Sequence, residues 1–187
     1  MHCVPSATHS WIYPGKGTLR YAAGMDHNQA FQAVKQSLDK AGLRIIREDR
    51  ERPWGGFFVI DESQAAEFIA WYFPEEDAAQ LTQQKVSPKI LLVAPGKRLS
   101  WQYHHRRAEL WRIIEGDADV AMSQTDEQGT AKTHHPGDIV RLTQGRRHRL
   151  IGREGWGIVA EIWQHTDPNH PSDEDDIVRL QDDFGRG

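Results

Sequence analysis

The sequence predicts an all-β fold, a single compact domain built around a small barrel of short antiparallel strands, with a helical extension on its N-terminal side. From about residue 85, short β-like runs are separated by Gly, Pro and Asp turn signals about every 8–20 residues, the rhythm of a sandwich or barrel. From Glu109 the side chains alternate, so that Glu109, Trp111 and Ile113 share one face of a predicted strand. With 187 residues, of which 38% are hydrophobic, the chain fits one globular core.

The N-terminal side is predicted to form helices in two places. The first helix begins at Asp26, because Gln29 completes a capping box and the apolar residues that follow recur at helical spacing. A second, short helix begins near Asp61, with Gln64 as its capping partner, and ends at Pro74.

The chain is expected to divide into three segments. Residues 1–25 show no clear periodicity and should form a tail or an irregular strap. Residues 26–84 form the helical extension, which includes a first β segment at about 43–60. Residues 85–187 form the barrel core and the C-terminal segment.

Charge and composition exclude several classes of partner. The formal net charge of −4 and the short pairs of basic residues give no track for a phosphate backbone, so no nucleic acid is expected. The longest apolar run, residues 90–94, is far shorter than the ~20 residues that cross a bilayer, and the N-terminus lacks a secretory pattern. No membrane partner is therefore expected, and the expected location is cytoplasmic. Because Cys3 is the only cysteine, a metal site would have to use His and oxygen ligands.

Four polar residues have the spacing of a site for one divalent metal ion. Gln102 and His104 lie two apart in a predicted strand and therefore point to the same face, whereas His105 faces outward or lines the rim unless a bulge shifts the register. Glu109 opens the next strand after a turn, and His148 comes from a distant hairpin. Two imidazoles, one carboxylate and one amide oxygen suit Zn²⁺ as the first candidate, with Mn²⁺, Fe²⁺, Co²⁺ or Ni²⁺ as alternatives.

Glycines complete two motifs around these four residues. The first is G-x5-Q-x-H-x4-E-x6-G at residues 96–116, and the second is G-D-x6-G-x2-H at residues 137–148. Together they resemble the paired motifs of the cupin superfamily, which implies a double-stranded β-helix, or jelly-roll barrel.

Four further strings resemble one branch of that superfamily, the type II mannose-6-phosphate isomerase cupin. They are RPWG at 52–55, LSWQYHH at 99–105, RAELW at 107–111 and EDDIVR at 174–179. This module often forms the C-terminal part of a bifunctional isomerase and mannose-1-phosphate guanylyltransferase. Nothing in this chain resembles the Gly-rich nucleotidyltransferase domain, so a stand-alone module without guanylyl transfer is expected. Arg106 and Leu110 stand where related sequences usually have histidines, which leaves the identity of the substrate open.

The resemblance implies a metal-dependent aldose–ketose isomerase that acts on a small-molecule sugar phosphate. Mannose 6-phosphate and fructose 6-phosphate are the first candidates, and the protein could form a homodimer. Two alternatives stay open: a non-catalytic sugar-binding or regulatory cupin, and a metal-cupin oxygenase that acts on a small polar metabolite.

An isomerase needs a base that carries a proton between neighbouring carbons, and Glu161 is the first candidate. It shares a strand face with Val159 and Trp163, so an apolar face would turn it inward, where burial would raise its pKa. Glu115 is the second candidate. In the alternative interpretation, Glu161 pairs with an arginine such as Arg141 and only supports the barrel.

Four residues near the predicted metal ligands are candidates for binding the substrate. Arg106, Arg107 and Arg146 could contact the phosphate, since guanidinium groups bind oxyanions through paired hydrogen bonds. Tyr103 could pack against the sugar ring, and packing within the core is the alternative for it.

Overall fold

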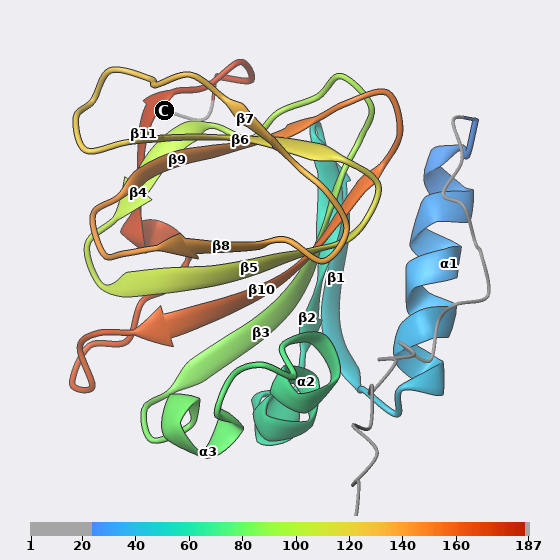
Figure 1. Cartoon of the computed structure of the whole chain (residues 1–187), viewed down its shortest axis with the longest axis vertical. Coiled ribbons are helices and arrows are strands. Elements are labelled where there is room, and N and C mark those ends of the chain that lie inside the picture. The colour runs from blue at the N-terminus through green and yellow to red at the C-terminus, as the bar shows by residue number, and fades with distance from the viewer. Residues whose placement is uncertain (1–23, 186–187) are drawn as a thin grey trace, which may run out of the picture.

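In the computed structural model, which describes residues 24–185, the chain forms two antiparallel β-sheets that face each other and enclose a barrel (Figure 1). The larger sheet has the order β1-β2-β3-β10-β5-β8 and the smaller one the order β11-β4-β9-β6-β7. The strands are β1 (Ile45–Arg52), β2 (Gly55–Ile60), β3 (Val86–Val93), β4 (Trp101–His104), β5 (Arg107–Glu115), β6 (Ala118–Ser123), β7 (Lys132–His134), β8 (Ile139–Leu142), β9 (Arg147–Gly152), β10 (Gly157–His165) and β11 (Ile177–Gln181). The predicted all-β jelly-roll barrel of the cupin type is confirmed.

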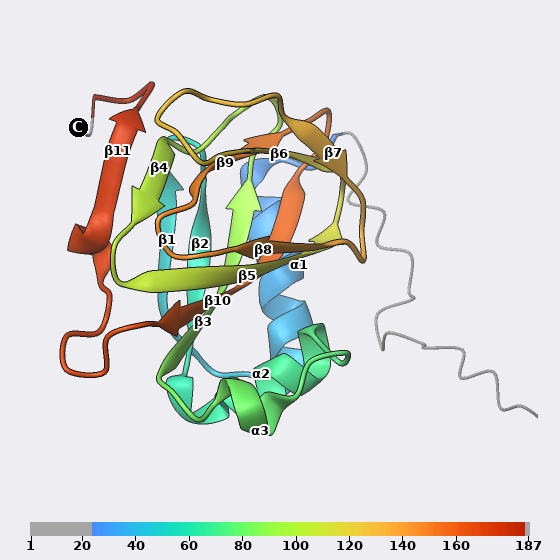
Figure 2. The same cartoon turned by 60° about the vertical axis from the view of Figure 1, so that its left-hand side comes forward.

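Helix α1 (His27–Lys40) precedes the strands and lies on the outer side of the larger sheet (Figure 2). Its predicted capping box is present, because the Asp26 carboxylate accepts a hydrogen bond from the Gln29 backbone N–H and Gln29 Oε1 accepts one from the Asp26 backbone N–H. Phe31 and Leu38 of α1 are fully buried against Phe58 of β2 and its neighbours. In the part of the chain that the structure describes, no helix has the length and apolar character to cross a bilayer. The predicted tail or strap of residues 1–25 lies, except for its last two residues, outside the described range.

The second helical region differs from its prediction at the N-terminus. Asp61 caps a 3-10 turn (Glu62–Gln64) by accepting from the Ser63 N–H, and α2 (Ala65–Tyr72) follows that turn. Gln64 is not the capping partner. Its carboxamide accepts from the Arg44 N–H at 2.7 Å and donates to the Gly42 carbonyl at 2.8 Å, because the connection between α1 and β1 leaves these backbone groups without partners in a strand. The short helix α3 (Ala78–Leu81) comes next.

The larger sheet separates two apolar cores. The outer core lies between this sheet and the helices, and it includes Leu110. The inner core fills one part of the barrel, and it includes Trp111 and Ile113. The predicted alternation along β5 is therefore present, since neighbouring residues of this strand point into different cores.

The β1–β2 hairpin is fixed against β3 by a glycine that no other residue can replace without strain. Gly55 has φ 136°, and a Cβ atom on it would lie 2.0 Å from the Leu92 carbonyl oxygen. The hairpin turn is also anchored by the Ala94 N–H, which donates to the Trp54 carbonyl at 2.9 Å. Close backbone contact thus sets the position of the turn over one end of the barrel.

We expect Gly55→Ala to lower the free energy of unfolding by about 3 kcal/mol or more, since it combines a forbidden backbone conformation with a backbone clash. Gly96→Ala is the matched control. Gly96 also has a positive φ, 66°, but a Cβ atom added to it would meet no other atom within 4 Å. The control should lower the free energy of unfolding by only about 1 kcal/mol. Urea denaturation of both variants measures the difference, and equal losses would contradict the packing argument.

Candidate metal centre

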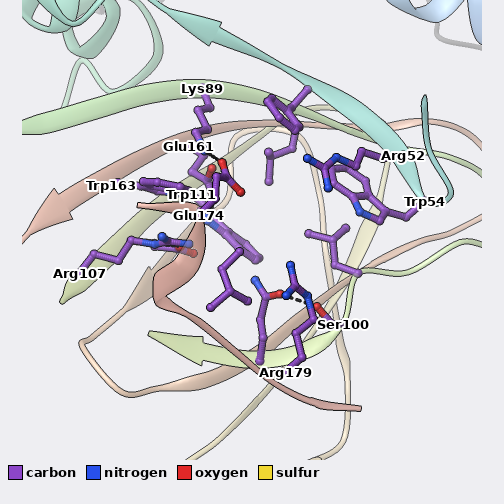
Figure 3. Close-up of a pocket in the computed structure, with 16 residues that line it drawn as sticks. Arg52, Trp54, Lys89, Ser100, Arg107, Trp111, Glu161, Trp163, Glu174 and Arg179 are labelled. Atoms are coloured by element: carbon purple, nitrogen blue, oxygen red, sulfur yellow. Dashed lines mark hydrogen bonds and ion pairs between the residues drawn. The ribbon is translucent and has the colours of Figure 1, made fainter. Parts of the chain in front are cut away.

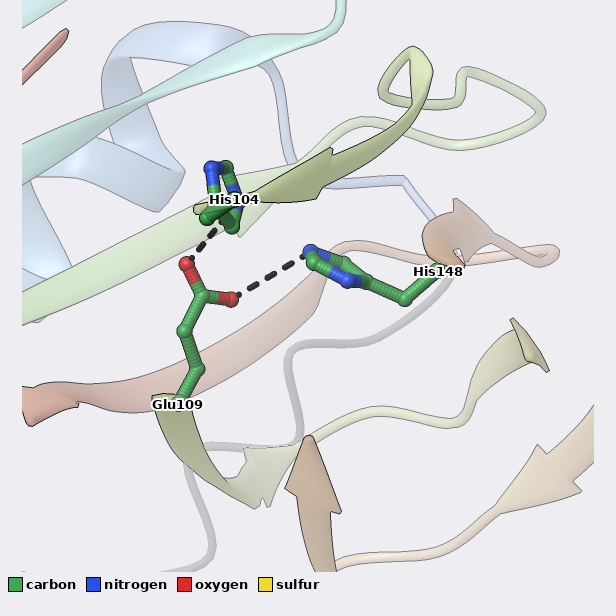
Figure 4. A group of neighbouring side chains, drawn as sticks. All are labelled: His104, Glu109 and His148. Atoms are coloured by element: carbon green, nitrogen blue, oxygen red, sulfur yellow. Dashed lines mark ion pairs between the residues drawn. The ribbon is translucent and has the colours of Figure 1, made fainter. Parts of the chain in front are cut away.

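Three buried side chains from three strands meet at one end of the barrel (Figure 4). They are His104 from β4, Glu109 from β5 and His148 from β9, and their candidate ligand atoms all lie within 4.8 Å of one another. His104 Nε2 is 3.2 Å from Glu109 Oε1, and His148 Nε2 is 3.3 Å from Glu109 Oε2. Each side chain is about 2% exposed. Residues distant in sequence therefore converge as the spacing predicted.

In both imidazoles, the nitrogen that faces away from the cluster, Nδ1, lies beside a backbone carbonyl. His148 Nδ1 lies 2.8 Å from the Arg146 carbonyl oxygen, and His104 Nδ1 lies 3.3 Å from the Asp176 carbonyl oxygen. A carbonyl only accepts, so Nδ1 is the nitrogen of each ring that donates, and Nε2 is the nitrogen that faces the cluster. Burial lowers the pKa of His104, against the attraction of Glu109, and so favours the neutral, ligating form.

The donor set fits a cation. His148 Nε2 and Glu109 Oε2 are buried and have no hydrogen-bond partner among the described residues. Burying unsatisfied polar atoms costs about 1–3 kcal/mol each. Although burial opposes its charge, the Arg107 guanidinium, which donates to Glu109 Oε1, holds the pKa of Glu109 well below its usual value, so the carboxylate is ionised. His104, Glu109 and His148 could therefore bind a metal ion.

Arg107 lies directly beside this cluster, with its guanidinium 3.4 Å above the Trp163 ring. Its Nε donates to Glu109 Oε1 at 2.7 Å, and its Nη2 lies 3.1 Å from His104 Nε2. The latter hydrogen bond uses the lone pair that would bind an ion, so ion binding would replace it. Arg107 Nη1 donates to the Ser172 hydroxyl and the Asp173 carbonyl, which ties the C-terminal segment to the centre.

Gln102 lies next to the cluster, and His105 lies outside it. Gln102 is buried on β4 and pairs with His148 in the β4–β9 register, while its Oε1 accepts from the Ser100 hydroxyl at 2.6 Å. Its role as a fourth ligand stays a prediction. His105 is exposed and packs its ring against Tyr103, on the opposite face from His104, as strand alternation requires.

A pocket that is partly open to solvent lies against the metal cluster, and its empty space, open solvent included, is about 550 Å³ (Figure 3). Glu109 and Gln102 belong to its lining, so the candidate centre borders the pocket. Trp111 and Trp163 supply apolar surface.

Glu161 points into this pocket from β10, as its predicted parity requires. Its Oε1 accepts a hydrogen bond from Trp111 Nε1 at 3.0 Å. Burial, with the negative charge of Glu109 as a second cause, raises the pKa of Glu161 to about 7. Arg141 is not its partner, because Arg141 forms an ion pair with Glu76 at the surface. Glu161 is thus a buried carboxylate that faces the pocket with a raised pKa, and its role as a general base stays a prediction.

Of the predicted substrate-binding residues, Arg107 lines the pocket, and the structure does not bring the others to it. Arg106 donates to the Pro171 carbonyl and the Asp173 carboxylate, both at 3.0 Å. Tyr103 lies under the Arg147 guanidinium at 4.2 Å, on the outer face of β4. Arg146 is half-buried and supplies its backbone carbonyl to His148.

Three cationic residues of the lining were missed by the sequence reasoning: Arg52, Lys89 and Arg179. Lys89 had a usable signal, because it alternates with Leu91 and Val93 and so shares their inward face. Arg52 and Arg179 each belong to one of the strings that carry the resemblance.

Comparison with known proteins gives a consistent family match. Residues 70–182 match the family described as mannose-6-phosphate isomerase C-terminal. The chain is 28% identical to the alginate biosynthesis protein AlgA of Pseudomonas putida, over 86% of this chain and 28% of AlgA. It is 30% identical to the xanthan biosynthesis protein XanB of Xanthomonas campestris, over 86% of this chain and 29% of XanB. The chain thus spans less than a third of the length of these two relatives.

Among solved structures, the oxalate decarboxylase of Lactobacillus farciminis is similar with a TM-score of 0.48 and 16% identity. The similarity covers 72% of this chain and 33% of that one.

Proposed function

The chain belongs to the mannose-6-phosphate isomerase C-terminal family, and from this premise we propose that it is a metal-dependent aldose–ketose isomerase acting on a sugar phosphate. The observation that carries the proposal is the buried cluster of His104, Glu109 and His148 beside a pocket into which Glu161 points with a pKa of about 7. Mannose 6-phosphate and fructose 6-phosphate are the first substrate pair to test.

His104, Glu109 and His148 would hold the ion, and Gln102 would add an oxygen ligand. Zn²⁺ is the first candidate, and Mn²⁺, Fe²⁺, Co²⁺ and Ni²⁺ also suit two nitrogens with carboxylate and amide oxygens. When bound, a divalent ion supplies a Lewis acid that favours negative charge on the carbonyl and neighbouring hydroxyl oxygens of an open-chain sugar.

Glu161 would move the proton between C2 and C1. Trp111 Nε1 donates to Glu161 Oε1, which orients the carboxylate and leaves Oε2 to take a proton from carbon. A pKa near the working pH lets one group accept the proton from C2 and return it to C1. The indole rings of Trp111 and Trp163 would exclude water, so that the proton stays with Glu161 between the two transfers.

Lys89 would assist this transfer by balancing charge. It is the register partner of Glu161 across β3 and β10, and its ammonium lies 3.2 Å from the Trp163 ring centre and 2.9 Å from Glu174 Oε1. Burial lowers the pKa of Lys89, against the attraction of Glu161 and Glu174. A cation at this place stabilises the Glu161 carboxylate before it takes the proton.

The proposal is tested by incubating metal-loaded protein with a panel of hexose and heptose phosphates and following ketose formation by NMR. We expect turnover on at least one phosphorylated aldose, and no turnover by chelator-treated protein. Sugar binding without turnover on any member would instead support a binding cupin. Oxygen consumption that depends on iron would support an oxygenase.

A further inference from the structure

The charged residues that line the pocket are unevenly distributed over its surface. Its carboxylates, Glu109, Glu161 and Glu174, lie at the end of the metal cluster, together with Lys89 and Arg107. These two cations are matched there, since Lys89 donates to Glu174 at 2.9 Å and Arg107 to Glu109 at 2.7 Å. In Figure 3, Arg52 and Arg179 lie on the other side of the pocket from Glu161 and Lys89. The side of the pocket away from Glu161 and Lys89 is thus lined by two further cations, Arg52 and Arg179.

Arg52 is held in place with one edge of its guanidinium left open. It is the last residue of β1, and the backbone contact at Gly55 fixes its hairpin on β3. Arg52 Nε donates to Asp49 Oδ2 at 2.7 Å, and Asp49 does not line the pocket. No described residue accepts a hydrogen bond from its Nη1 or Nη2. The fork of donors that binds oxyanions is therefore oriented and available.

Arg179 reaches the same pocket from the opposite sheet. It lies on β11 and pairs with Gln102 in the β11–β4 register, so it stands next to the strand that carries His104. Arg52 comes from the far edge of the larger sheet and Arg179 from the edge of the smaller one. Two half-buried arginines on separate edge strands converge on one cavity only because the barrel closes there.

We propose that Arg52 and Arg179 form the subsite that binds the phosphate group of the substrate. This inference rests on the proposed function and adds the orientation of the substrate. Lys89 and Arg107 already donate to Glu174 and Glu109, so a phosphate beside them would compete with these carboxylates, whereas the open Nη edge of Arg52 has no such competitor. A phosphate bound there would direct the rest of the open-chain sugar across the pocket towards Glu161. The subsite accepts phosphate monoesters and, more weakly, inorganic phosphate.

The test measures binding of inorganic phosphate and of mannose 6-phosphate by calorimetry, with chelator-treated protein so that no metal ion contributes. Wild-type protein should bind both, and Arg52→Gln and Arg179→Gln should each weaken both affinities by about tenfold or more, because each removes a charge-assisted contact. The double variant should show no measurable binding of inorganic phosphate. Arg52→Lys keeps the charge but lacks the fork of donors, so its affinity for phosphate should lie between those of wild type and Arg52→Gln.

Arg141→Gln is the matched control, since Arg141 also lies on a strand of the larger sheet but pairs with Glu76 away from the pocket. It should leave phosphate affinity unchanged. Thermal melting of each variant checks that it is folded. Wild-type affinity in the double variant, or no phosphate binding by wild-type protein, would overturn the subsite.

The outcome is separable from that of the proposed function. Phosphate binding that depends on Arg52 and Arg179, without turnover of any sugar phosphate, would keep the subsite and remove the isomerase. Turnover of a sugar phosphate, with unchanged phosphate affinity in the arginine variants, would keep the isomerase and remove the subsite.

Discussion

Replacing His148 with alanine should release the metal ion from the protein. His148 supplies one of two imidazole nitrogens, and its Nε2 has no other partner among the described residues. Loss of an outer hydrogen-bond partner of a ligand typically costs about 10–100-fold in metal affinity, so loss of the ligand itself should cost more. Elemental analysis after dialysis should find close to one ion per chain in wild-type protein and almost none in the variant.

His105→Ala is the matched control for this loss. His105 follows His104 directly, but its ring is exposed on the outer face of the barrel. This variant should keep its ion. A His104→Ala and His148→Ala double variant that retained stoichiometric metal would show that the ion binds elsewhere.

The second large effect is expected for Glu161→Gln, which should lower kcat by about 10²–10⁴-fold, the usual contribution of a general base. Metal content should not change, because Glu161 is not in the ligand cluster. Glu115→Gln is the control, since Glu115 does not line the pocket. A Glu161→Gln variant with wild-type kcat would exclude this residue as the base.

The pH profile gives an independent check on Glu161. A carboxylate acts as a base only when it is deprotonated, so turnover should be high above its pKa and fall as the pH drops through it. Burial raises the pKa of Glu161 to about 7 in the protein without metal, and attraction to a bound cation would lower it. The acid limb of the wild-type profile should therefore lie at or below about pH 7, and the residual activity of Glu161→Gln should lack this limb.

Strand parity explains which parts of the site could be predicted from sequence. His104, Glu109 and Glu161 each lie in a strand whose alternation fixes the inward face, and the structure buries all three. The turn spacing predicted a barrel of short strands, and the resemblance of the paired motifs to cupins implied the jelly roll. The capping partner of Asp61 was predicted wrongly, because Gln64 bonds to backbone groups about 20 residues away that sequence pattern does not bring together.

The substrate-binding side of the pocket could not be predicted in the same way. Arg106 and Tyr103 were selected because they are close in sequence to the ligands, yet Tyr103 points to the outer face and Arg106 binds the C-terminal segment. Arg52 and Arg179 lie on edge strands of two different sheets, β1 and β11, and reach one pocket only because the two sheets face each other. Such convergence depends on tertiary register, which no local pattern encodes.

The most direct test of the proposed function is a metal titration of the chelator-treated protein in the presence of a sugar phosphate, with aldose-to-ketose conversion followed by NMR. A metal-dependent isomerase built on His104, Glu109 and His148 predicts that the rate rises with bound metal and stops rising at one ion per chain. A protein that is saturated with metal and binds the sugar phosphate, yet converts none of it with any of the candidate ions, would contradict the proposal.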